Sequence, residues 1–258
     1  MPLLSIITIT YNNAAGLTKT AQSVTEQTNK DFEWIIIDGA STDETREILK
    51  TTSANTIVSE PDRGIYDAMN KGIAKSNSDY LLFLNAGDCL SDSETTAHIV
   101  SALSTKPDFL YSDALEHNID NNTKHLKPAR LWHKIDRGMF THHQAMIYKT
   151  SIIKEHKLQY DTNYQIAADY KLTLQYLKHC KTDNITYLKS TPICLFECGG
   201  VSQTQSTTGR NEQYKIRKEQ KTCSFLFNLY VLITQLISWQ IAKLCPSVYN
   251  VIRGKKSA

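Results

Sequence analysis

The sequence of 258 residues lacks the marks of several protein classes. Its six cysteines form no CxxC pair and no dense cluster, so it predicts neither a zinc site nor a disulfide framework, and we expect a reducing compartment. The net charge of +3 is too small to indicate a nucleic-acid-binding surface. No basic segment precedes the apolar residues 3–9, so we expect a first strand there and not a signal peptide.

Two motifs of nucleotide-binding enzymes are also missing. No GxGxxG follows the first apolar run, which argues against a dinucleotide-dependent dehydrogenase. A nucleotidyltransferase that makes sugar nucleotides would be expected to carry an early glycine-rich loop with a basic residue, and Gly16 alone does not provide one. The sequence contains no internal repeat and no low-complexity tract.

The sequence does contain a regular alternation of short apolar runs and helical patterns. Strands rich in Ile, Leu, Val and aromatics, each followed by a helix, are typical of a parallel sheet that is buried on both faces. The first half therefore predicts an α/β fold. The predicted strands span residues 3–10, 33–37, 56–59 and 80–84, and the predicted helices span 15–27, 42–52, 65–76 and 92–104.

The pattern loosens after Pro107 and predicts a second half of α+β type. Residues 109–111 and 124–126 are predicted to form an antiparallel hairpin around a polar turn at 120–122, at the edge of the sheet. The remaining predictions are a strand at 144–148, a helix at 167–179, one or two strands within 185–197 and an amphipathic helix at 223–244.

Polar clusters follow three of the predicted strands, at the point where each strand ends. They are Thr10-Tyr11-Asn12, residues 38–43 and residues 85–88. Because the carboxyl ends of parallel strands face a common crevice, these clusters are expected to form one nucleotide site.

Two aspartates and one arginine of this region have side chains suited to a nucleotide. Asp38 precedes Gly39, and its carboxylate could accept the imide hydrogen of a uracil or hydrogen bonds from the donors of a guanine. Asp88 could hold a divalent cation that bridges two phosphates, or could be an ordinary turn aspartate. Arg63 could stack on a base, pair with a phosphate or point into solvent.

Four segments together resemble the nucleotide-binding half of family 2 glycosyltransferases with the GT-A fold. They are residues 8–13 (TITYNN), 38–43 (DGASTD), 59–72 (SEPDRGIYDAMNKG) and 84–88 (LNAGD). Residues 141–145, 167–170 and 199–202 further resemble the branch that builds bacterial exopolysaccharide and O-antigen repeat units, the colanic-acid type.

The resemblance implies a GT-A fold, with a Rossmann-like, mostly parallel central sheet flanked by helices. Residues 1–105 would be the nucleotide-sugar-binding half and 106–209 the acceptor and catalytic half of the same domain. Residues 210–258 would be a basic, amphipathic C-terminal helical segment.

The resemblance also implies an inverting transfer of a sugar from a nucleoside diphosphate sugar, with uridine as the base by family habit. The acceptor would be a saccharide on a polyprenyl diphosphate lipid. The implied nucleotide contacts are Thr10, Tyr11, Asn12 and Asp38, with Arg63 and Asn70 as weaker candidates.

Asp88 matches the metal-binding aspartate of the family and implies Mg²⁺ or Mn²⁺ as cofactor. Asn85 and Gly87 stand where many relatives carry aspartate.

Asp169 matches the catalytic base, although a carboxylate in the first turn of a helix is also common without a catalytic role. His143 and Gln144 would line the acceptor side. His143 could instead approach the diphosphate, or could be a structural histidine. Gly199 and Gly200 would form a mobile flap over the donor or merely a turn. A binding subunit that kept the pocket but lost turnover is the alternative without catalysis, and the presence of both aspartates argues against it.

The predicted helix at 223–244 has a heavy apolar stripe and basic flanks at 210–221 and 253–256. We interpret it as an interfacial anchor that places the protein on the cytoplasmic face of the cell membrane. A packing or oligomer helix and a true span are the alternatives. Neither Trp132 nor Trp239 follows an arginine, as in the Gln-x-x-Arg-Trp motif of processive synthases, which favours addition of a single sugar.

Overall fold

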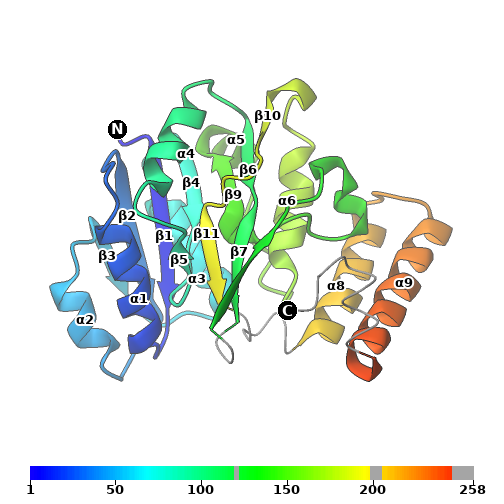
Figure 1. Cartoon of the computed structure of the whole chain (residues 1–258), viewed down its shortest axis with the longest axis horizontal. Coiled ribbons are helices and arrows are strands. Elements are labelled where there is room, and N and C mark those ends of the chain that lie inside the picture. The colour runs from blue at the N-terminus through cyan, green and yellow to red at the C-terminus, as the bar shows by residue number, and fades with distance from the viewer. Residues whose placement is uncertain (119–121, 198–204, 246–258) are drawn as a thin grey trace.

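The computed structural model describes residues 1–118, 122–197 and 205–245. A seven-stranded sheet in the order β10-β6-β9-β4-β1-β2-β3 forms its centre (Figure 1). The strands are β1 (Leu4–Thr10), β2 (Phe32–Asp38), β3 (Thr56–Ser59), β4 (Tyr80–Phe83), β6 (Phe109–Ser112), β9 (Met146–Lys149) and β10 (Ile185–Leu188). β1 pairs in parallel with β2 and β4, and β9 runs antiparallel to β4 and β6. The predicted α/β fold with a mostly parallel central sheet is confirmed.

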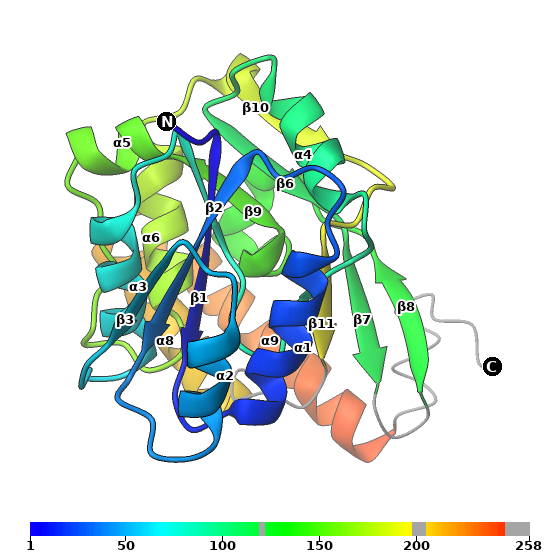
Figure 2. The same cartoon turned by 90° about the vertical axis from the view of Figure 1, so that its left-hand side faces the viewer.

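Helices cover both faces of this sheet, because alternate residues of the central strands are apolar on each side (Figure 2). Ile7 and Ile9 of β1 share a core cluster with residues of α3, α5, α6 and α8, whereas Leu4 and Ile6 share the other with α1, α2 and α4. The helices are α1 (Ala14–Thr25), α2 (Thr45–Thr51), α3 (Ile65–Lys75), α4 (Thr95–Leu103), α5 (Thr150–Glu155), α6 (Ala168–Leu177), α8 (Ser206–Glu219) and α9 (Phe225–Leu244).

The second half differs from the prediction in its strand pairing. A smaller sheet has the order β5-β11-β7-β8, with β5 (Cys89–Leu90), β7 (Ala114–Asn118), β8 (Thr123–Lys127) and β11 (Cys194–Glu197). The antiparallel hairpin is therefore β7 with β8, and the predicted pairing of 109–111 with 124–126 is wrong. Every residue of β6 is buried, so this strand lies inside the central sheet, between β9 and β10.

Of the one or two strands predicted within residues 185–197, the structure has two, β10 and β11, which lie in different sheets. One further boundary differs from the prediction. The predicted strand at 144–148 begins as a short 3₁₀ helix, η2 (His143–Ala145), and becomes strand β9 only at Met146. Gln144 is consequently a helical residue at the entry to β9 and not a strand residue.

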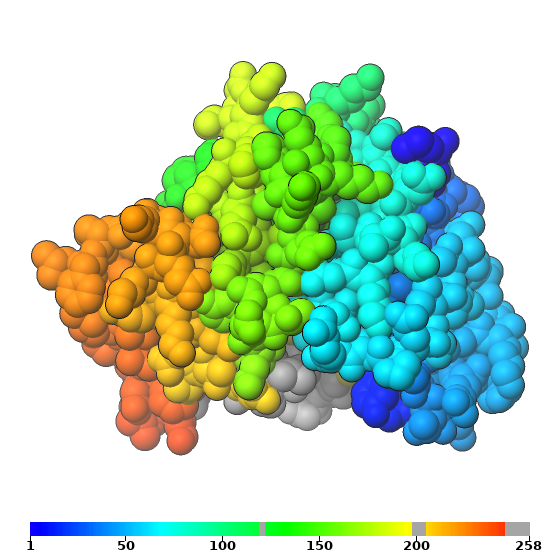
Figure 3. Space-filling model, turned by 180° about the vertical axis from the view of Figure 1, so that it is seen from behind, coloured from blue at the N-terminus to red at the C-terminus, as the bar shows by residue number. Residues whose placement is uncertain are grey.

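α8 and α9 pack against each other at the end of the molecule opposite α2 (Figures 1 and 3). The fully buried Arg217 donates from Nε to Asn228 Oδ1 at 2.6 Å, and Asn228 in turn donates to the Tyr214 carbonyl at 3.1 Å. α9 is long and apolar enough to cross a membrane, and only 11% of its most apolar stretch is buried in the protein. Its exposed apolar side chains are Phe225, Leu226, Tyr230, Ile233, Ile237 and Leu244.

Candidate active site

The three polar clusters come together at the carboxyl edge of the central sheet. Thr10 and Asp38 are register partners, and the Gly39 amide donates to the Thr10 carbonyl at 3.0 Å. The Ala86 amide donates to the Ile9 carbonyl at 3.0 Å, which fixes the segment after β4 beside the end of β1. The clusters separated in the sequence thus occupy one edge of three neighbouring strands.

The loop after β1 is held open by hydrogen bonds to the loop after β2. Asn12 has a positive φ of 46°, and its amide donates to Ser41 Oγ at 2.8 Å while its Oδ1 accepts from the Thr42 amide at 2.8 Å. The neighbouring Tyr11 is 63% exposed and is available to contact a flat ligand. Thr10 is buried, and its Oγ1 has no hydrogen-bond partner among the described residues.

Asp38 is fully buried and ties the ends of β2 and β3 together. Its Oδ1 accepts from Ser41 Oγ, and its Oδ2 accepts from Ser59 Oγ, both at 2.5 Å. The carboxylate therefore holds the loop after β2 and the end of β3 in place. Its contact with a nucleotide base stays a prediction.

The two weaker nucleotide candidates occupy different surroundings. Arg63 lies in the loop before α3 with a side chain that is 82% exposed and pairs with Asp67 at 3.3 Å. The Asn70 side chain donates from Nδ2 to the Tyr160 carbonyl at 2.9 Å, and its Oδ1 accepts from the Tyr160 backbone amide at 2.8 Å. Asn70 thus joins α3 to the segment before α6, which is a structural connection.

Asp88 lies in a tight turn after β4, where Gly87 has a φ of 108°. Its carboxylate is buried, which raises its pKa to about 7, although Gln144 Nε2 donates to Oδ2 at 2.6 Å. The buried amide oxygens Asn85 Oδ1 and Gln144 Oε1 have no hydrogen-bond partner among the described residues. Carboxylate and amide oxygens are the hard ligands that Mg²⁺ and Mn²⁺ prefer, so the buried oxygens of Asp88, Asn85 and Gln144 have the donor chemistry that such a cation requires.

Within the described part of the chain, no three His, Cys, Asp or Glu side chains gather as a metal-binding cluster.

His143 lies between the two predicted catalytic regions. Its Nε2 lies 3.2 Å from Asn85 Nδ2, and its Nδ1 lies 3.7 Å from Asp169 Oδ2. Burial lowers the pKa of His143 to about 3, so the imidazole is neutral at physiological pH. A neutral ring that accepts from Asn85 carries its proton on Nδ1, which faces Asp169.

Asp169 lies in the first turn of α6, with 19% of its side chain exposed. Burial raises the pKa of its carboxyl to about 6, partly offset by the Tyr170 amide, which donates to Oδ1 at 2.7 Å. The other oxygen, Oδ2, is the one nearest His143. η2 therefore links the two aspartates, because Gln144 binds Asp88 and the adjacent His143 faces Asp169.

Two residues that shape this region were not predicted from the sequence. Asn13 caps α1 through its Oδ1 and donates from Nδ2 to the Ala86 carbonyl at 3.1 Å. Glu212 of α8 binds the backbone just before α6. An asparagine before a helix could have suggested the cap, whereas nothing in the sequence connects residue 212 with residue 169. Gly199 and Gly200 lie outside the described residues.

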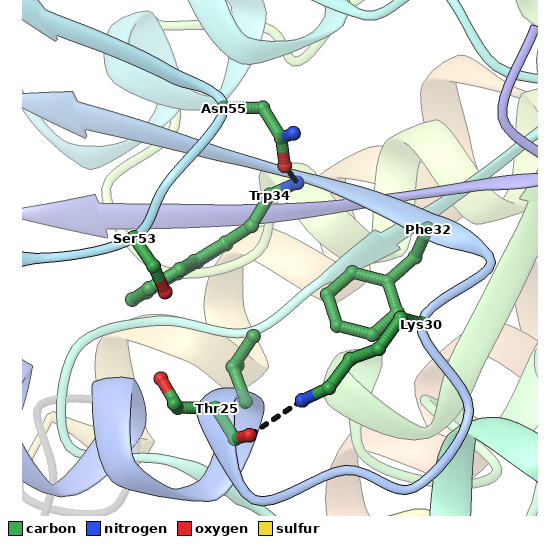
Figure 4. A pocket seen from close by; sticks show the side chains of 7 residues that line it. Thr25, Lys30, Phe32, Trp34, Ser53 and Asn55 are labelled. Atoms are coloured by element: carbon green, nitrogen blue, oxygen red, sulfur yellow. Dashed lines mark hydrogen bonds between the residues drawn. The ribbon is translucent and has the colours of Figure 1, made fainter.

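The cavity shown in Figure 4 lies at the other edge of the sheet, near the amino ends of β2 and β3. Its volume is about 440 Å³, and Trp34, Phe32, Lys30 and Asn55 are among the residues that line it. None of the predicted site residues contributes to it. The candidate active site at the carboxyl ends of the strands is therefore separate from this cavity.

Comparison with known proteins connects the chain to sugar transfer. The profile of "Glycosyl transferase family 2" matches residues 5–159. A "PGL/p-HBAD biosynthesis glycosyltransferase" from Mycobacterium bovis is 30% identical over 187 residues, covering 67% of this chain and 69% of that protein. An uncharacterized glycosyltransferase from Mycobacterium tuberculosis is 32% identical over 206 residues, covering 78% of this chain and 77% of that protein.

Solved structures show the same fold at lower identity. Staphylococcus aureus TarS, residues 1–349 in complex with UDP-GlcNAc, superposes with a TM-score of 0.68 at 16% identity, covering 91% of this chain and 71% of that chain. The mannosyltransferase PcManGT from Pyrobaculum calidifontis, in complex with GDP-Man and Mn²⁺, superposes with a TM-score of 0.66 at 15% identity, covering 98% of this chain and 79% of that chain.

Proposed function

The chain belongs to glycosyltransferase family 2 and has the GT-A fold, and we propose that it transfers one sugar from a nucleoside diphosphate sugar to a lipid-linked saccharide with inversion. The observation that supports this most strongly is the link between Asp88 and Asp169 through η2. In this proposal the diphosphate binds beside Asp88 and Asp169 acts as the base. The proposed setting is the assembly of a bacterial surface polysaccharide, such as an exopolysaccharide, a capsule or an O-antigen.

The proposed donor is a UDP-sugar, bound at the carboxyl edge of the sheet. The strand-end loops support this proposal, because Tyr11 is exposed beside the buried Thr10 and Asp38. Structural neighbours with nucleotide sugars, one with UDP-GlcNAc and one with GDP-Man, agree with a nucleoside diphosphate sugar but do not distinguish the base.

In the proposed reaction, Asp169 removes the proton from the acceptor hydroxyl. The hydroxyl oxygen forms a bond to the anomeric carbon, and the bond from that carbon to the diphosphate breaks with its electron pair leaving on the diphosphate. A carboxylate with a pKa of about 6 is ionised at neutral pH and is more basic than an ordinary aspartate. The neutral His143, whose Nδ1 lies 3.7 Å from Asp169 Oδ2, adds no positive charge that would make the carboxylate less basic.

Asp88, with the amide oxygens of Asn85 and Gln144, would hold the divalent cation. A bound Mg²⁺ or Mn²⁺ supplies positive charge that stabilises the departing diphosphate.

α9 supports a membrane-bound acceptor. α9 has exposed apolar side chains, and exposed lysines lie on α8 (Lys215 and Lys218) and on α9 (Lys243). Anionic lipid surfaces bind helices that combine exposed apolar and basic side chains. We propose a location on the cytoplasmic face of the cell membrane, with α9 in the interface. With the apolar face of α9 in the membrane, the active site would lie close to a sugar carried by a membrane lipid.

A panel of nucleotide sugars tests the donor. With Mn²⁺ present, we expect UDP-sugars to raise the melting temperature of the full chain and at least one of them to be hydrolysed slowly. The absence of both effects for every UDP- and GDP-sugar would contradict the proposed donor class.

Flotation with anionic liposomes tests the membrane contact. A variant with Leu226→Ser, Ile233→Ser and Ile237→Ser should lose most of its binding, because these side chains are exposed and their replacement leaves the core unchanged. Leu126→Ser, which removes an exposed leucine from β8, is the matched control and should bind like the unmodified chain. Equal flotation of all three proteins would exclude the interfacial role, and a concentration-dependent dimer lost in the triple variant would instead indicate an oligomer helix.

A further inference from the structure

Three consecutive backbone amides before α6 converge on one carboxylate from α8. The amide of Gln165 donates to Glu212 Oε1, and the amides of Ile166 and Ala167 donate to Glu212 Oε2, each at 2.9 Å. Ala167 is the residue that caps α6, and Asp169 follows in its first turn. Glu212 therefore binds the chain immediately before the predicted base.

The Glu212 carboxylate that accepts these hydrogen bonds is buried. Glu212 is 9% exposed, and hydrogen bonds to an ionised acceptor are roughly twice as strong as neutral ones. Ala167 is the N-cap of α6, and its amide has no partner within the helix. A carboxylate close to a helix N-terminus is also favoured by the helix dipole. Glu212 thus binds, from a distant part of the chain, the N-cap amide and the two amides before it.

α8 itself is anchored on both sides of Glu212. Ile216 is fully buried in the core cluster that also contains Tyr170 of α6. Gly209 packs so closely on Ile166 that a Cβ there would lie 3.0 Å from Ile166 Cγ2. At the other side, Arg217 holds α9 through Asn228. A fixed helix can therefore hold the 165–167 segment in a fixed position.

We propose that Glu212 is a positioning residue for Asp169, holding the 165–167 segment so that the first turn of α6 places the carboxylate opposite Asp88. This inference rests on the proposed function of Asp169 as the base. Glu212 acts through the backbone and not on the substrate. Since a displacement of about 1 Å at a reacting group can cost about 10²-fold in rate, a loosened segment should slow turnover without changing donor binding.

The test uses the full chain with Glu212→Ala, Glu212→Gln and the control Glu219→Gln. Glutamine keeps one oxygen that can accept, so it retains part of the three-amide contact, whereas alanine removes all of it. Glu219 lies on the same helix and binds the Tyr164 hydroxyl and Lys171 instead of the 165–167 amides. Its substitution removes the same charge without touching the proposed contact.

We expect kcat to fall by about 10²-fold in Glu212→Ala and by about tenfold in Glu212→Gln, with the Kd for UDP and Mn²⁺ unchanged within twofold. Glu219→Gln should keep kcat within twofold of the unmodified chain. Should Glu212→Ala fail to fold, Glu212→Gln alone decides. Unchanged kcat in a folded Glu212 variant, an equal loss in Glu219→Gln, or a parallel loss of UDP binding would each overturn the proposal.

Amide hydrogen exchange separates this inference from the proposed function. Peptides that cover 165–170 should exchange at least tenfold faster in Glu212→Gln than in Glu219→Gln, and this result does not depend on any donor or turnover. Equal exchange in the two variants would overturn the inference by itself. Full turnover by Asp169→Asn would instead overturn the base assignment, on which the catalytic part of the inference rests.

Discussion

Asp169→Asn is expected to make the protein more stable while removing its activity. The folded protein raises the pKa of Asp169 to about 6 from an ordinary value of 3.8, chiefly by burial. Ionising this carboxyl therefore costs more in the folded chain than in the unfolded chain. At about 1.4 kcal/mol for each pKa unit, the cost is up to about 3 kcal/mol where both states are ionised.

The sign of this effect depends on pH in a defined window. Below about pH 4 the carboxyl is protonated in both states and costs nothing, whereas above about pH 6 the whole cost is present. Asparagine is neutral throughout and its Oδ1 can still accept from the Tyr170 amide. We therefore expect the gain in unfolding free energy to be about 3 kcal/mol near pH 8 and about 1 kcal/mol near pH 4.5.

Calorimetric melting at both pH values measures this difference. The melting temperature should rise by about 6 °C near pH 8 and by much less near pH 4.5. Asp161→Asn is the matched control, because Lys171 holds the pKa of that carboxyl below its ordinary value and the substitution should lower the melting temperature. A melting temperature that does not rise near pH 8, or that rises equally at both pH values, would refute the argument that Asp169 is a buried, destabilising carboxylate.

Two further outcomes follow from the site. With donor and Mn²⁺ saturating, kcat should fall tenfold per pH unit below about pH 6, because Asp169 takes up a proton there. The buried His143 near Asp169 stays neutral, and Tyr66, Tyr148 and Tyr160 have raised pKa values, so these four side chains keep their protonation state between pH 5 and 7. A pH-independent kcat in that range would argue against Asp169 as the base. Asp88→Ala should weaken Mn²⁺-dependent UDP binding by at least about tenfold in calorimetry while leaving binding in EDTA unchanged, and an unaltered Mn²⁺ dependence would exclude Asp88 as a ligand.

The first half of the fold could be predicted from the sequence because its signals are local. Each early strand is short, mostly apolar and largely buried, and the polar cluster at its end marks the carboxyl edge of the sheet. The convergence of Thr10, Asp38 and Asp88 at this edge follows from the parallel pairing of β1 with β2 and β4.

The second half could not be predicted in the same way, because strand pairing there depends on burial that the sequence does not display. Residues 109–112 resemble a possible edge strand, yet their complete burial places them inside the central sheet. Likewise, the partners of Asn70 and Glu212 are backbone groups far away in the sequence. Contacts of this kind depend on tertiary packing and leave no periodic pattern.

The most direct test of the account is single-turnover sugar transfer by Asp169→Asn with a donor from the nucleotide-sugar panel, measured on protein whose UDP and Mn²⁺ affinity has been determined. We expect transfer to fall at least about 10³-fold while the affinity stays within twofold of the unmodified chain, since binding and proton removal lie on different residues. Transfer at the unmodified rate would contradict the central claim that Asp88 and Asp169 divide diphosphate binding and base catalysis between them.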